Sequence, residues 1–68
     1  MKIYVVEKID SYGNSEVYGV FKKMYAARLD IAKHYNEYPE FKDNEEGCEW
    51  EWSSECGDTY IIHLLELK

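Results

Sequence analysis

The chain has 68 residues and a formal net charge of −6, from 14 acidic and eight basic side chains. This length allows one domain, residues 1–68, with a small core, and no run of about 18 apolar residues is present to cross a membrane. The acidic balance argues against direct contact with nucleic acid, because phosphate contacts need lysine and arginine. We therefore expect a cytoplasmic protein that binds neither membrane nor nucleic acid.

The first half of the chain is predicted to form a hairpin followed by a helix. Lys2–Ile9 is rich in β-branched and aromatic residues, which predicts a strand. Turn-forming residues 11–15 lead into a second predicted strand, Glu16–Phe21, in which Gly19 indicates a bulge or a close backbone approach. From Lys22 to Asn36 the apolar period becomes helical. The predicted apolar face of this helix comprises Met24, Tyr25, Ala27, Leu29, Ile31, Ala32 and Tyr35.

The second half is predicted to form a polar connection, Glu37–Gly47, and two further strands. Cys48–Ser53 alternates between large apolar residues and glutamates, which places the two kinds on opposite faces. Thr59–Leu67 is apolar on both faces, as expected of a central strand. The predicted fold is α+β, in the order β-β-α-β-β. A single helix packs on one face of a small three- to four-stranded, mainly antiparallel sheet, and the other face is expected to present tyrosines or tryptophans.

Acidic residues are concentrated in residues 37–55, which contain eight acids and one lysine and therefore have a formal charge of −7. One interpretation is a solvated face that keeps the protein soluble and protects an edge strand. The other is a binding surface, because carboxylates along one strand face repeat at about 6.6 Å and can imitate nucleic-acid phosphates. Trp50 and Trp52 are predicted to pack in the core, with an interface role as the alternative. The predicted partner-binding residues are Tyr38, Glu40, Phe41, Asp43, Glu45, Glu46, Glu49, Glu51 and Glu55, with Tyr38 and Phe41 as apolar anchors.

The cysteines and histidines do not form a recognisable catalytic or metal site. Cys48 and Cys56 are expected to be free thiols, because a strand separates them beyond bonding distance. Together with His34 and His63 they offer zinc-binding residue types, but without the short spacings of a zinc site. We expect no metal, no cofactor and no enzyme activity.

Four stretches resemble a known class of protein: the opening Met1–Glu7, the strand Val17–Phe21 before an alanine-containing helix, the corner Tyr38–Phe41, and the closing strand Ile62–Leu67. Over nearly its whole length the chain resembles the very small acidic proteins encoded by bacteriophages and prophages. The resemblance implies an inhibitor of host defence, as anti-CRISPR and anti-restriction proteins are, in the cytoplasm of an infected bacterium. It assigns a role to no individual residue.

The leading hypothesis is a non-enzymatic phage inhibitor that mimics DNA and covers a basic surface of a nucleic-acid-binding host protein. The alternative is a small homo-oligomeric protein, structural or ligand-sequestering, in which tyrosines and Arg28 line a pocket. Arg28 is otherwise expected to be an edge residue whose stem packs while its head reaches water. A homodimer is an open alternative to the monomer, because a chain this small has few interior positions for seven tyrosines and two tryptophans.

Overall fold

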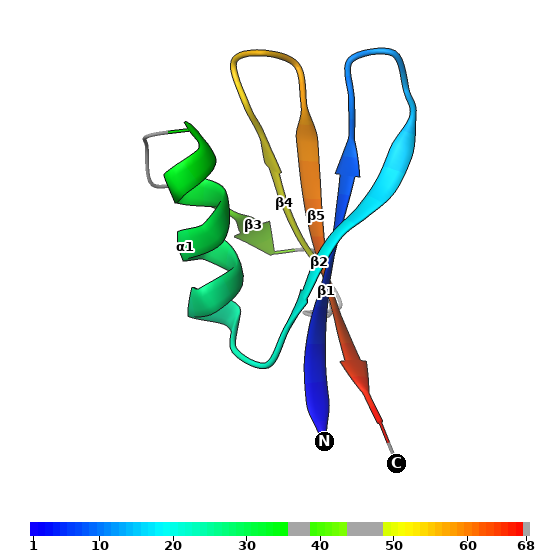
Figure 1. The fold of residues 1–68 in the computed structure, drawn as a ribbon, viewed down its shortest axis with the longest axis vertical. Helices are drawn as coiled ribbons and strands as arrows, with labels where there is room; N and C mark the ends of the chain where they lie inside the picture. Colours follow the sequence, from blue (N-terminus) through cyan, green and yellow to red (C-terminus); the bar gives the residue numbers. More distant parts are fainter. Residues whose placement is uncertain (36–38, 44–48, 68) are drawn as a thin grey trace.

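The structure is a computed structural model that describes residues 1–35, 39–43 and 49–67. In this part of the chain, one helix and five strands form an α+β fold in which the helix follows the second strand, as predicted (Figure 1). The elements are β1 (Lys2–Ile9), β2 (Ser15–Phe21), α1 (Met24–Tyr35), β3 (Lys42–Asp43), β4 (Glu49–Ser53) and β5 (Thr59–Glu66). The strand β3 was not expected, because two residues are too few to show a period.

The sheet is antiparallel throughout, with the strand order β2-β1-β5-β4-β3. The two ends of the chain therefore supply neighbouring inner strands, and the predicted central position of β5 is confirmed. Backbone hydrogen bonds join the termini: the amino group of Met1 donates to the carbonyl of Leu67 at 2.9 Å, and the amide of Leu67 donates to the carbonyl of Met1 at 2.6 Å.

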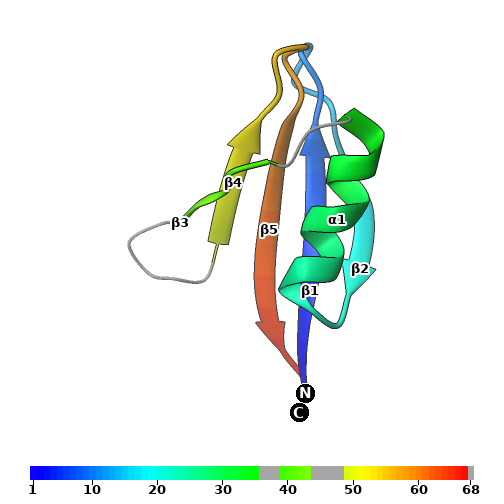
Figure 2. The ribbon, with the colours of Figure 1, turned by 90° about the vertical axis from the view of Figure 1, so that its left-hand side faces the viewer.

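The hydrophobic core lies between α1 and one face of the sheet, where the helix crosses β1 and β2 (Figure 2). The fully buried hydrophobic residues are Val6, Ala27, Ile31, Tyr60 and Ile62. Large rings extend this core toward β4, including those of Tyr35, Trp50 and Trp52. The prediction that the tryptophans pack in the core is confirmed. The prediction that the uncovered face carries tyrosines or tryptophans is wrong, because these rings fill the space that a single helix leaves over the sheet.

The helix buries a narrower stripe than its sequence suggested. Ala27 and Ile31 are fully buried, whereas Tyr25 and Leu29 are 62% and 44% exposed. The predicted helical face was therefore too wide on this side, because a lone helix on a small sheet buries little beyond one i, i+4 row. The predicted end of the helix at Asn36 lies outside the described residues.

A β-bulge in β2 confirms the expectation raised by Gly19. The register of β1 and β2 changes so that Val6 pairs with Gly19 and Glu7 with Val17, which leaves Tyr18 as the extra residue. The Tyr18 ring contacts the Tyr60 ring edge-on, with centroids 5.2 Å apart. A Cβ on Gly19 would lie 3.0 Å from the Phe21 ring, so the Gly19 backbone and the Phe21 side chain also approach each other closely.

Hydrogen bonds attach the end of α1 to the turn between β4 and β5. The Tyr35 hydroxyl lies 2.9 Å from a carboxylate oxygen of Asp58 and 2.6 Å from the hydroxyl of Tyr60. In the same turn, the Ser54 hydroxyl accepts a hydrogen bond from the amide of Asp58, and Gly57 adopts a φ of 96°. Burial raises the pKa of both Tyr35 and Tyr60, which keeps these phenols neutral as hydrogen-bond donors.

Replacing Tyr35 with phenylalanine should lower the free energy of unfolding by about 1–3 kcal/mol. The change removes a partner from the fully buried Tyr60 hydroxyl while keeping the ring. Urea denaturation followed by circular dichroism would measure the loss. The matched control is Tyr25→Phe on the exposed side of the same helix, and equal stability of the two variants would contradict the role of this hydrogen bond.

Stability should also fall at alkaline pH. Burial, followed by the hydrogen bond to Asp30, raises the pKa of Tyr18 to about 12. The folded state therefore holds this proton more tightly than the unfolded state, whose tyrosine pKa is about 10. The resulting stabilisation is complete below pH 10 and is lost as pH rises from 10 toward 12. Melting temperatures between pH 8 and 12 should fall less steeply for Tyr18→Phe than for Tyr12→Phe, since Tyr12 is 90% exposed. Parallel curves would contradict this account.

Candidate functional site

The sheet face opposite α1 is covered by no described helix or strand (Figure 1). Paired residues in an antiparallel sheet point to the same side, so the register places Ile3 with Leu65, and Val5 with Val20. Val17, Val20 and Leu65 on this side are 68%, 57% and 47% exposed. We call this surface, formed by the outward residues of β1, β2, β4 and β5, the open face.

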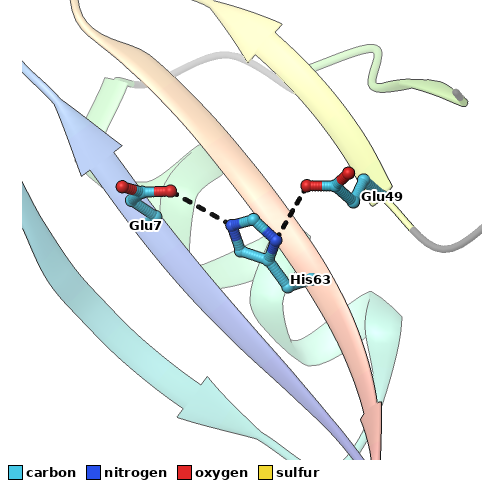
Figure 3. Close-up of polar contacts among 3 residues, drawn as sticks. All are labelled: Glu7, Glu49 and His63. Atoms are coloured by element: carbon cyan, nitrogen blue, oxygen red, sulfur yellow. Dashed lines mark hydrogen bonds and ion pairs between the residues drawn. The ribbon is translucent and has the colours of Figure 1, made fainter.

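A histidine between two glutamates crosses the open face. On β5, the Nε2 atom of His63 lies 3.1 Å from Oε1 of Glu7 on β1, and its Nδ1 atom lies 2.9 Å from Oε2 of Glu49 on β4 (Figure 3). A protonated imidazole donates from both nitrogens, whereas a neutral ring donates from only one. These side chains are 30–46% exposed, and the cluster contains two carboxylates for one imidazole.

Glu51 extends this acidic row along β4. It points to the same side as Glu49, because the two residues are two positions apart on one strand, and its side chain is exposed. The register pairs Glu51 with Ile61 on one side and with Lys42 on the other. The lone lysine of the acidic segment therefore lies opposite Glu51, and carboxylates alternate with aliphatic side chains across the open face.

The remaining predicted contact residues do not all join this row. Glu40 is exposed beside the buried Pro39, and Glu55 is exposed in the turn that follows β4, at the opposite end of that strand from Glu49. Asp43 belongs to β3, where its backbone pairs with Trp50. Tyr38, Glu45 and Glu46 lie outside the described residues.

Phe41, predicted as an apolar anchor for a partner, packs inward. Its ring is half-buried, with its centroid 6.2 Å from that of Trp52. The guanidinium carbon of Arg28 lies 5.7 Å from the centre of the same ring, at cation–π distance. Phe41 therefore contributes to the margin of the core, and the exposed apolar contacts near the acids come from the aliphatic residues of the open face.

Glu7 and His63 belong to the site but were not predicted from the sequence. Alternation along β1 puts Glu7 on the same face as Ile3 and Val5, and alternation along β5 puts His63 on the same face as Ile61 and Leu65. The missing information was that β1 pairs with β5, which connects residues 56 positions apart.

The described residues contain no group of three or more His, Cys, Asp or Glu side chains arranged to hold a metal ion. Glu7 and Glu49 contact opposite nitrogens of His63, so they diverge around the ring instead of meeting at one point. His34 lies on α1, away from the open face. Cys56 is an exposed free thiol, whereas Cys48 lies outside the described residues.

Comparisons of this chain with protein-family models, with curated proteins and with solved structures find no match. Among the described residues, the helix is too short to cross a membrane.

Replacing His63 with alanine should lower the free energy of unfolding by about 1 kcal/mol or less, because partly exposed ion pairs contribute little. The difference from the unmodified protein should shrink in 1 M NaCl, where the Debye length is about 3 Å. The matched control is His34→Ala, since that histidine is exposed on α1. A loss of several kcal/mol that does not respond to salt would show that His63 acts through packing and not through its carboxylate contacts.

Proposed function

We propose that this chain is a non-enzymatic binding protein whose open face covers a basic surface on a nucleic-acid-binding host protein. The observation that supports this proposal is the placement of Glu7, Glu49 and Glu51 among exposed aliphatic side chains on one uncovered side of the sheet. Exposed aliphatic surface favours contact with a protein, and the negative charges favour a partner surface rich in lysine and arginine.

The charge pattern suits imitation of a nucleic acid. Glu49 and Glu51 are separated by two residues on one strand, or about 6.6 Å, which is comparable to the repeat of phosphates along a DNA strand. A protein groove that attracts phosphates would also attract this row, and long-range attraction would speed the encounter. The aliphatic residues beside the row supply contacts that DNA lacks, so the complex need not depend on charge alone.

A phage-encoded inhibitor of host defence is the setting that we propose for this activity. CRISPR nucleases and restriction enzymes have basic DNA-binding grooves, and blocking such a groove requires no catalysis by the inhibitor. A chain of 68 residues with a charge of −6 could act by occupancy, as a monomer or as a homodimer.

The direct test is competition with DNA. Purified CRISPR nucleases and restriction enzymes would be incubated with labelled DNA and increasing amounts of this protein, and bound DNA would be followed by fluorescence anisotropy. At least one enzyme should release its DNA, and the effect should weaken as NaCl rises from 50 to 300 mM because salt screens charges. Absence of competition with every enzyme tested would contradict the proposal.

Charge reversal locates the surface. Glu49→Lys/Glu51→Lys should reduce competition at least tenfold while the protein remains folded. The control Glu16→Lys/Asp30→Lys makes the same change in net charge at exposed positions on β2 and α1, and it should compete nearly as well as the unmodified chain. Glu51→Lys alone, which leaves the His63 contacts in place, repeats the test if the double variant is unstable. Equal loss in the control would assign the effect to overall charge and overturn the role of the open face.

A further inference from the structure

A basic cavity lies where β2 leads into α1, on the opposite side of the sheet from the open face. Its volume is about 660 Å³, within the usual range for small-ligand sites. The described residues that line it are Lys2, Tyr4, Lys22, Lys23, Met24, Tyr25 and Arg28. They come from the start of β1, the connection after β2 and the first turns of α1 (Figure 1). We propose that this cavity binds a small organic phosphate with an aromatic ring, of the mononucleotide class.

The charge around the cavity differs sharply from that of the whole protein. Four of the eight lysine and arginine residues line it, and no acidic residue is among its described lining. The register pairs Lys2 with Glu66 across β1 and β5, so one of the four has an acidic neighbour outside the cavity. Lys22, Lys23 and Arg28 remain as a cluster of like charges, and an anion between them would relieve their repulsion.

The helix increases this positive potential. The N-terminus of α1, which begins at Met24, has a partial positive charge that acidic residues normally stabilise. The first turn of α1 has no acidic residue, and two lysines precede it. Without a bound anion this arrangement is unfavourable for the helix. The same arrangement offers a bound phosphate both side-chain charge and the positive end of the helix.

Arg28 adds an independent observation. Its Nε atom is buried and has no hydrogen-bond partner among the described residues. Buried donors without a partner are rare in folded proteins, and an unseen water or ion is one of the explanations. The contact with the Phe41 ring restricts the guanidinium, so Arg28 is held at the cavity wall. A phosphate in the cavity would suit the planar donor group of this lining residue.

The apolar part of the cavity suggests the rest of the ligand. Tyr4, Met24 and Tyr25 also line it, and the Tyr25 side chain is 62% exposed on the helix surface. An exposed aromatic ring beside a cationic cluster can stack on a flat base while the cations hold its phosphate. The net charge of −6 repels a long nucleic acid, whose many phosphates would extend beyond the cavity. A single nucleotide brings only a few charges.

The test uses ATP, AMP, adenosine and inorganic phosphate as probes, with isothermal titration calorimetry in 20 mM NaCl. ATP and AMP should bind, inorganic phosphate should bind more weakly, and adenosine should give no signal because it lacks the charge. Tyr25→Ala should weaken AMP binding several-fold and leave phosphate binding unchanged. Absence of binding by 1 mM ATP would overturn the proposal. Equal affinity for AMP and inorganic phosphate would overturn the aromatic part of it.

The lysines provide a sharper comparison. Lys22→Gln/Lys23→Gln should lower ATP affinity about tenfold or more, since charged hydrogen bonds are lost, and should raise the melting temperature of the unliganded protein. The control Lys8→Gln/Lys33→Gln removes the same charge at positions away from this cavity. It should neither lower the affinity for ATP nor raise the melting temperature. Equal loss of ATP binding in both variants would show attraction by overall charge and overturn the site. Competition with DNA by the open face should be unaffected, so the two proposals fail independently.

Discussion

The antiparallel pairing of β1 with β5 is the constraint on which the other features depend. It places the two ends of the chain side by side and runs from Lys2 opposite Glu66 to Ile9 opposite Thr59. This register directs Val6 and Ile62 toward the helix and directs Glu7 and His63 to the other side. A slip of one residue would exchange the two faces of one strand, so the core and the acidic row are determined together.

A second constraint is that the chain has one described helix for two sheet faces. The helix and the aromatic rings of Tyr35, Trp52 and Tyr60 close one face, where Tyr35 also bonds to the turn between β4 and β5. The other face keeps exposed aliphatic residues and the carboxylates around His63. Cations gather instead where β2 leads into α1. The molecule therefore separates an acidic, partly aliphatic face from a basic cavity, although its net charge alone describes it as acidic.

Local sequence patterns predicted the features that depend on neighbouring residues. The β-branched and aromatic residues of Lys2–Ile9 predicted β1, the helical period predicted α1, and Gly19 indicated the bulge that directs Tyr18 toward Tyr60. Side-chain period also predicted that Trp50 and Trp52 would lie opposite Glu49 and Glu51. Each of these follows from steric preferences within a few residues, which a single sequence contains.

Features that depend on distant pairing were not predictable in this way. Nothing local indicates that Glu7 reaches His63, because their contact requires the pairing of the first and last strands. Tyrosines or tryptophans were expected on the uncovered face, although Trp50 and Trp52 were themselves assigned to the core, because the sequence does not state how much space lies between helix and sheet. The lysines that precede α1 had no predicted role. The fold brings Lys2 beside Lys22 and Lys23, and it thereby groups the cations of the basic cavity.

The most direct measurement of the central claim is the register of β1 and β5 in solution. Backbone nuclear Overhauser contacts in a labelled sample should join Val5 with His63 and Glu7 with Ile61. Contacts displaced by one residue, or contacts of β1 with another strand in place of β5, would contradict the arrangement. The acidic row and the open face would then not exist as described.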